Sequence, residues 1–167
     1  DEQALEETLE ALVEDARRHY RECEYDLTLS VLREAEQKAR CQKHLDSIAD
    51  KMNKAKAGQQ LETELRSMVD KSNTFYRQCR FEKAMPVLNE ALAKARCAKH
   101  KESINKKIDL TRKRQRHEQA TLDLFESANG LYTEGKYPDA LARLEKALKH
   151  TSCERFRDSL GDKIAKV

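Results

Sequence analysis

The feature that most constrains the fold of this chain is a segment that occurs three times in register. The copies read YRECEYDLTLSVLREAEQKARC at residues 20–41, YRQCRFEKAMPVLNEALAKARC at 76–97 and YTEGKYPDALARLEKALKHTSC at 132–153. Each copy starts 56 residues after the one before, in a chain of 167 residues, so almost the whole chain is repeat. Self-similarity at a fixed period is typical of repeat proteins, in which each unit buries its apolar face against its neighbours.

The repeat sets the expected domain organisation. We predict a single repeat domain over residues 1–167, with units at 1–56, 57–112 and 113–167. The chain starts at Asp1 rather than at Met and stops close to a repeat boundary. We therefore interpret it as an excised piece of a longer protein.

Composition and apolar spacing both favour helices. The chain has only 4 Gly and 2 Pro, charged residues make up 38% of it, and no alternating run rich in Val or Ile occurs. That balance is typical of long helices with solvated faces. Thr28, Leu32 and Ala35 follow one another at steps of four and three, which places them on one face of a helix. The sequence therefore predicts an all-α protein.

Each unit is predicted to contain a helical hairpin with a break at 23–24, 79–80 or 135–136. Gly135 is a good helix stop, and Pro138 suits the first turn of the helix that follows. The extra residues of each unit, 42–63, 98–119 and those after 153, either form a third helix or lengthen the first helix of the next unit. We favour long helices of about 30–37 residues, with a possible break near Gly58. The stretch 110–119 lacks an apolar stripe and should be a solvated helix face or a loop.

Aligned in register, the units resemble the tetratricopeptide (TPR) repeat. The TPR pattern has a small residue, an aromatic, Gly, a second aromatic, Ala, a large apolar residue and Ala. In the third unit these positions hold Ala128, Tyr132, Gly135, Tyr137, Ala140, Leu144 and Ala147. In the second they hold Ser72, Tyr76, Cys79, Phe81, Ala84, Leu88 and Ala91, and in the first Ala16, Tyr20, Cys23, Tyr25, Thr28, Leu32 and Ala35. The period differs, since TPR units repeat every 34 residues and these repeat every 56. The resemblance implies a solenoid of three TPR-like helix-turn-helix hairpins with elongated helices.

The resemblance also implies a concave groove lined by the first helix of each hairpin. The groove-facing positions of this chain are Val13, Arg17, Tyr20 and Arg21, then Val69, Asn73, Tyr76 and Arg77, then Phe125, Asn129 and Tyr132. Asn73 and Asn129 match the Asn with which many TPR proteins hold a peptide backbone or terminal carboxylate. Val69 and Phe125 stand where the carboxylate clamp of the family has Lys. The tyrosines also fit a second interpretation, as half-buried spacers between hairpins.

These observations favour a non-catalytic scaffold that binds a peptide or partner helix. Residues 57–112 carry 12 basic and 7 acidic side chains, so an acidic partner is expected. Two alternatives stay open. The array could self-assemble end to end into oligomers or filaments, or residues 96–117 could bind nucleic acid or an acidic partner. Their basic patch is Arg112, Lys113, Arg114 and Arg116, but the formal net charge of +3 and the absence of interleaved aromatics make nucleic acid an unlikely partner.

The five cysteines are expected to be reduced thiols of a cytoplasmic protein, because disulfides between equivalent helix positions would need an unfavourable geometry. The sequences CQKH at 41–44 and CAKH at 97–100 place Cys and His on one helix face, as in some zinc sites. The third unit has Phe156 in place of His, and the two pairs lie a whole unit apart. We therefore predict small buried packing residues rather than a metal site or a Cys–His nucleophile, and no metal or cofactor is expected.

Catalysis and membrane insertion are not predicted. The chain has no Gly-rich phosphate loop and no HExxH, DxDG or GxSxG motif. Nor does it contain an apolar run near the roughly 20 residues that span a bilayer.

Overall fold

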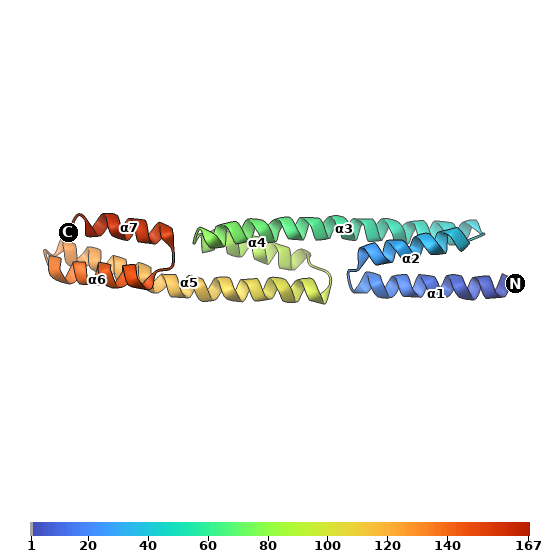
Figure 1. The fold of residues 1–167 in the computed structure, drawn as a ribbon, viewed down its shortest axis with the longest axis horizontal. Helices are drawn as coiled ribbons and strands as arrows, with labels where there is room; N and C mark the ends of the chain where they lie inside the picture. The colour runs from blue at the N-terminus through green and yellow to red at the C-terminus, as the bar shows by residue number, and fades with distance from the viewer. Residues whose placement is uncertain (1) are drawn as a thin grey trace. The chain divides into compact units, whose positions relative to one another are not determined.

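The structure, a computed structural model, describes residues 2–167 and is all-helical over that range (Figure 1). Its helices are α1 (Glu2–Arg21), α2 (Tyr25–Lys38), α3 (Gln42–Arg77), α4 (Phe81–Lys94), α5 (Ala98–Thr133), α6 (Tyr137–His150) and α7 (Glu154–Ile164). The predicted fold class is therefore confirmed at the level of an all-α protein. Asp1, the first residue of the predicted unit 1–56, lies outside the described residues. Within residues 2–167, no helix combines the length and apolar character needed to cross a membrane.

The prediction of long helices is confirmed for 42–63 and 98–119, whereas the residues after 153 form the separate 11-residue helix α7. Helices α3 and α5 are each 36 residues long and include the segments between the repeated stretches. α3 continues through Gly58 without a break, and the stretch 110–119 is helical within α5.

The helices are separated by tight turns at the predicted positions. Cys23, Cys79 and Gly135 have φ angles of 57°, 55° and 77°, in the left-handed region that ends many helices. In the first turn the Cys23 amide donates to the Tyr20 carbonyl at 3.1 Å, and the second turn repeats this bond between residues 79 and 76 at 3.1 Å. Glycine adopts this conformation without strain, whereas each cysteine there carries a cost of about 1 kcal/mol.

The described chain divides into two compact units. The first comprises the residues up to Ser67 with Leu92–Ser103, and the second comprises Met68–Ala91 with Ile104–Val167. In the first unit α1 and α2 pack side by side (Figure 1). Their core joins α1 and α2 to the start of α3 and consists of Leu9, Ala16, Leu32, Ala35 and Ile48.

The core of the second unit is built in the same way from α5, α6 and α7. It consists of Ala128, Leu144, Ala147 and Leu160. The small residues at equivalent positions, Ala16 and Ala128, are 2% and 1% exposed, which lets the helix backbones approach closely. In both units, therefore, small and large apolar residues of the repeat pattern meet in the core.

Tyr25 and Gly58 make an unusually close contact between α2 and α3. A Cβ atom on Gly58 would lie 2.2 Å from Cε1 of the buried Tyr25 ring. Because Gly58 has no side chain, the Tyr25 ring can pack directly against the backbone of α3, which stays a regular helix at this point.

Candidate functional site

A pocket lies in the first unit among α1, α2 and α3. It has a volume of about 380 Å³. Its lining consists of Glu14, Ala16, Arg17, Tyr20, Arg21, Thr28, Leu32, Lys51 and Lys54. The lining includes Arg17, Tyr20 and Arg21, which the TPR resemblance predicts to be groove-facing residues of the first repeat. The structure thus brings together all but Val13 of the predicted site residues of that unit.

The base of the pocket is apolar and its rim is charged. Ala16, Thr28 and Leu32 are all buried, and the Thr28 hydroxyl donates to the Glu24 carbonyl at 2.9 Å rather than to the pocket. The ring of Tyr20 is half-buried and meets the Tyr25 ring edge-on, with 5.7 Å between centroids. An apolar side chain entering the pocket would therefore lose little hydrogen bonding and would gain burial.

Basic side chains dominate the rim. Arg17 Nη1 donates to Glu14 Oε2 at 3.1 Å, and Arg21 Nη2 lies 3.4 Å from the other oxygen of the same carboxylate. Lys51 Nζ donates to Ser47 Oγ at 2.7 Å. Four cations and one carboxylate thus line the pocket, which gives its rim an excess of positive charge.

Lys54, the fourth cation of the rim, forms an ion pair one turn back along α3. Its Nζ lies 2.7 Å from Asp50 Oδ2. The hydrogen bond with Asp50, reinforced by the opposite charge, raises the pKa of Lys54 and lowers the pKa of Asp50. Lys54 is therefore held in its charged form.

In the second repeat, 57–112, the predicted residue Asn73 on α3 faces a lysine on α5. Asn73 Oδ1 accepts a hydrogen bond from Lys107 Nζ at 3.5 Å. Tyr76 is half-buried and meets Phe81 edge-on, with 6.1 Å between ring centroids. Val69 is half-buried and Arg77 is exposed.

A lysine also faces the tyrosine position of the third repeat. Lys163 Nζ lies 4.5 Å from the centroid of the Tyr132 ring, a favourable cation–π distance. Asn129 Oδ1 is buried without a hydrogen-bond partner among the described residues. Phe125 is half-buried against the core of α5, α6 and α7 and lines a pocket of about 200 Å³ there.

Sequence reasoning missed this lysine position. Lys51, Lys107 and Lys163 are separated by the repeat period of 56 residues, and each lies two helices after the helix that carries its tyrosine. The period itself was the signal that could have identified them.

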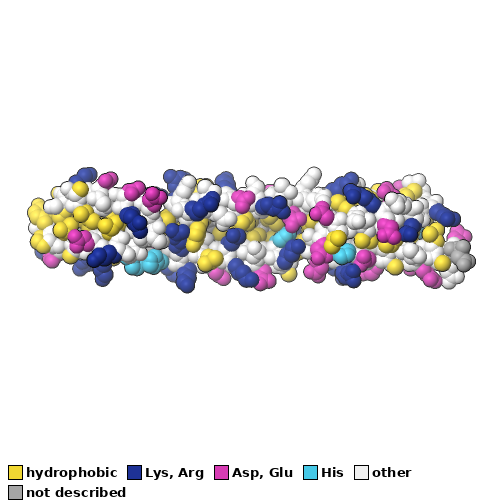
Figure 2. Space-filling model, viewed as in Figure 1, with side chains coloured by type: hydrophobic (Ala, Val, Ile, Leu, Met, Phe, Trp, Pro, Cys, Tyr) yellow, Lys and Arg dark blue, Asp and Glu magenta, His cyan; other side chains and the backbone are white. Residues whose placement is uncertain are grey.

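The four residues of the predicted basic patch differ in exposure. Arg112, Lys113 and Arg116 are exposed, but Arg114 lies against the protein, with its guanidinium 4.7 Å from the centroid of the Tyr76 ring. Arg114 also donates to Ser152 Oγ at 3.4 Å. On the face shown in Figure 2, Lys and Arg side chains are interspersed with Asp and Glu. This arrangement does not favour a continuous phosphate-binding track.

One buried carboxylate in the second unit organises the segment before α7. Glu118 is 1% exposed and accepts hydrogen bonds from Thr151 Oγ1 at 2.6 Å and from Ser152 N and Oγ at 3.0 and 2.8 Å. Burial alone would raise the pKa of Glu118, but these hydrogen bonds, together with the nearby His117, lower it. Glu118 is thus a structural anion that ties α5 to the segment between α6 and α7.

Four of the five cysteines are paired, contrary to the expectation of reduced thiols. Cys23 forms a disulfide with Cys97, and Cys79 forms one with Cys153. In both pairs the Cα atoms are 6.1 Å apart, within the usual range. The expectation was wrong because it compared equivalent helix positions, whereas each bond joins a turn cysteine to the loop cysteine 74 residues later.

Cys41 is the one free cysteine of the described residues, and it is exposed. Cys97 and Cys153 are 6% and 1% exposed. The expectation of buried packing residues therefore fits Cys97 and Cys153 but not Cys41.

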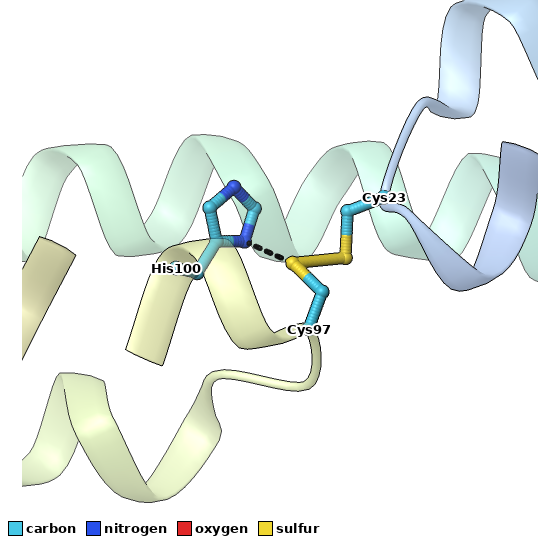
Figure 3. Close-up of side chains that lie close together, drawn as sticks. All are labelled: Cys23, Cys97 and His100. Atoms are coloured by element: carbon cyan, nitrogen blue, oxygen red, sulfur yellow. Dashed lines mark hydrogen bonds between the residues drawn. A yellow bond between two sulfur atoms is a disulfide. The ribbon is translucent and has the colours of Figure 1, made fainter. Parts of the chain in front are cut away.

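The Cys23–Cys97 disulfide has a histidine beside it (Figure 3). His100 Nδ1 lies 3.1 Å from Cys97 Sγ, and His100 Nε2 lies 3.4 Å from Glu62 Oε1. The Tyr25 hydroxyl donates to Cys23 Sγ at 3.2 Å. Sequence reasoning paired Cys97 with His100 but missed Cys23, which comes from the turn after α1.

The Cys79–Cys153 disulfide has a different neighbour. Phe156 occupies the position equivalent to His100 and packs against this pair. The two disulfides thus share one backbone geometry and differ in the side chain beside them.

Comparison with protein-family models, curated proteins and solved structures gives no match to this chain. Its functional interpretation therefore depends on the geometry described above.

Proposed function

We propose that this chain is a non-catalytic protein-interaction module, an array of TPR-like helical hairpins that binds a segment of a partner protein. The pocket among α1, α2 and α3 is the proposed binding site, and the groove-facing residues Arg17, Tyr20 and Arg21 are its contact residues. The occupant is an apolar side chain of a peptide or helix that carries acidic residues on either side.

The observation that carries this proposal is the combination of an apolar base and a basic rim in one pocket. A volume of about 380 Å³ accommodates a leucine or phenylalanine side chain with space around it. Burial of such a side chain provides about 2 kcal/mol. That gain is too small for stable binding, so further contacts must come from the rim.

The charges of the rim define the partner. Arg17 and Arg21 share the Glu14 carboxylate, so the two guanidinium groups are only partly neutralised. Acidic residues of a partner would pair with these groups and with Lys51, and the attraction would weaken in high salt. A basic or neutral segment would lack these contacts.

The test uses a fluorescent synthetic peptide with leucines at helical spacing and glutamates between them. We expect fluorescence anisotropy to show binding to the full chain at low salt. The double variant Arg17→Glu with Arg21→Glu should bind on the order of 10-fold more weakly or worse, because attraction becomes repulsion at two positions. Arg66→Glu is the matched control, since Arg66 is exposed on α3 and is not part of the pocket lining.

Two results would refute the proposal. One is equal binding by the wild type and the double variant; the other is equal binding of a matched peptide with lysines in place of glutamates. A further variant, Asn73→Ala with Asn129→Ala, tests whether binding uses more than the first unit. If that variant alone abolishes binding, the site lies at the asparagines and not in the pocket.

A further inference from the structure

We propose that reduction of the Cys23–Cys97 disulfide creates a zinc site whose ligands are Cys23, Cys97 and His100. The two Sγ atoms and a ring nitrogen of His100 all lie within 4.8 Å of one another (Figure 3). Two thiolates and one imidazole form a donor set that zinc prefers. Three protein ligands leave the fourth tetrahedral position to water.

The backbone geometry suits this ligand set. Tetrahedral Zn²⁺ with Zn–S distances near 2.3 Å places two sulfurs about 3.8 Å apart. The Cα atoms of Cys23 and Cys97 are 6.1 Å apart, which allows side-chain rotation to bring the sulfurs to that separation. His100 already has Nδ1 3.1 Å from Cys97 Sγ, so the imidazole faces the place where the ion would bind.

Neighbouring side chains orient and stabilise the ligands. Glu62 Oε1 lies 3.4 Å from His100 Nε2, where the carboxylate favours a proton on Nε2 and leaves the Nδ1 lone pair for the metal. The Tyr25 hydroxyl donates to Cys23 Sγ at 3.2 Å, a contact that also favours the thiolate. Cys23 and Cys97 are 4% and 6% exposed, so a bound ion would be largely shielded from competing ligands in solution.

The disulfide is converted to the zinc site in two steps. A dithiol reductant gives two electrons and two protons to the Sγ–Sγ bond, which breaks to give two thiols while the reductant becomes a disulfide. Zn²⁺ then binds both sulfurs as thiolates, and two protons pass to solvent. The site therefore alternates between a covalent cross-link under oxidising conditions and a metal cross-link under reducing conditions, and the turn after α1 stays attached to the start of α5 in both.

The second disulfide provides an internal control. Cys79 and Cys153 have the same Cα separation of 6.1 Å, but Phe156 replaces the histidine. The glutamate equivalent to Glu62 is Glu118, whose oxygens accept hydrogen bonds from Thr151 and Ser152. This pair therefore offers only two ligands and should bind zinc weakly.

The experiment uses the full chain with Cys41→Ser, so that the exposed thiol cannot contribute. The protein is reduced with a trialkylphosphine without oxygen, equilibrated with Zn²⁺, desalted and analysed for metal by mass spectrometry. We expect one zinc per chain after reduction and none in the unreduced protein. Co²⁺ in place of zinc should give thiolate-to-cobalt charge-transfer absorption and tetrahedral d–d bands.

Substitutions at the histidine position test the ligand assignment. His100→Phe, which copies the second disulfide, should weaken zinc binding at least 100-fold, and Phe156→His should raise the capacity to two zinc ions per chain. Glu62→Gln should weaken binding about 10-fold by loosening the histidine. Far-UV circular dichroism of each reduced variant establishes that the helices persist.

Three results would overturn the proposal. These are a reduced protein that retains no zinc while its helices persist, a zinc content unchanged by His100→Phe, and cobalt spectra without thiolate charge transfer. Phe156→His supplies an independent measurement if the His100 variant fails to fold.

Discussion

The contact between Tyr25 and Gly58 gives the sharpest prediction about stability. Replacing a glycine inside a helix with alanine normally stabilises the protein by up to about 1 kcal/mol, because alanine has the higher helix propensity. At Gly58 the new Cβ would lie 2.2, 2.5 and 2.7 Å from three ring carbons of Tyr25. Real Cβ atoms do not approach that closely, so either the ring or α3 must move.

The magnitude follows from how firmly the ring is held. Tyr25 is 4% exposed, its hydroxyl bonds to Cys23 Sγ, and its ring packs against the Cys23–Cys97 pair. Overpacking in such surroundings costs about 1–3 kcal/mol. Since this exceeds the propensity gain, we expect Gly58→Ala to lower the free energy of unfolding by about 1–2 kcal/mol.

Gly130→Ala is the matched control. Gly130 also lies within a long helix, α5, but a Cβ there would meet nothing within 4 Å. This substitution should stabilise the protein by about 0.5–1 kcal/mol. Two glycine-to-alanine changes in helices of equal length are thus predicted to have opposite signs.

Urea unfolding followed by far-UV circular dichroism measures both effects. Each variant is assessed on the transition of the compact unit that carries it, because the two units need not unfold together. In a Tyr25→Ala background, Gly58→Ala should become stabilising, since the clash is gone. If Gly58→Ala stabilises the protein in the wild-type background, or destabilises it equally with and without the tyrosine ring, the steric explanation is wrong.

Three further predictions concern the second unit. Glu118→Gln should destabilise it by about 2 kcal/mol, because an amide cannot accept all the hydrogen bonds that the carboxylate accepts; urea unfolding at neutral pH measures this. The pKa of Glu118 lies below its ordinary value in the folded state. The stability that its carboxylate contributes is therefore fully present above the ordinary pKa of about 4.3 and is lost as the pH falls through the folded-state pKa. The difference in unfolding free energy between wild type and Glu118→Gln should shrink in acid, and a constant difference would contradict the assignment. Replacing Cys79 and Cys153 with serine should lower the free energy of unfolding by on the order of 4 kcal/mol, because the disulfide closes a long loop. Thermal unfolding measures this loss, with Cys41→Ser as a control that should leave stability nearly unchanged.

The sequence contained enough information to predict the helices but not which residues meet where the helices pack. Repeat-spaced apolar residues, few glycines and a left-handed turn position at Gly135 defined the helices and their breaks. Gly58 was a misleading signal, because a glycine in a helix pattern suggests a break. Here it instead makes room for Tyr25, and only the fold places that ring next to it.

The thiol site was less predictable because its residues come from separate parts of the chain. A usable signal was present, since Cys23 and Cys97 have the same separation of 74 residues as Cys79 and Cys153. That separation is longer than the repeat period, so each disulfide joins different positions of the repeat. Aligning the units position by position compared only equivalent cysteines and did not reveal the pairing. The first-unit pocket was better anticipated, because its tyrosine and two arginines lie on one helix, whereas Lys51 comes from another.

The overlap of the two disulfides has a consequence for the integrity of the chain. One bond closes the segment from Cys23 to Cys97 and the other the segment from Cys79 to Cys153, so every peptide bond between Cys23 and Cys153 lies inside at least one covalent ring. A protease that cuts once in this region opens a ring but releases no fragment. Such a nicked protein would migrate as a single species in a denaturing gel until a reductant separated the fragments. A single cut in this region would therefore leave the two fragments covalently linked.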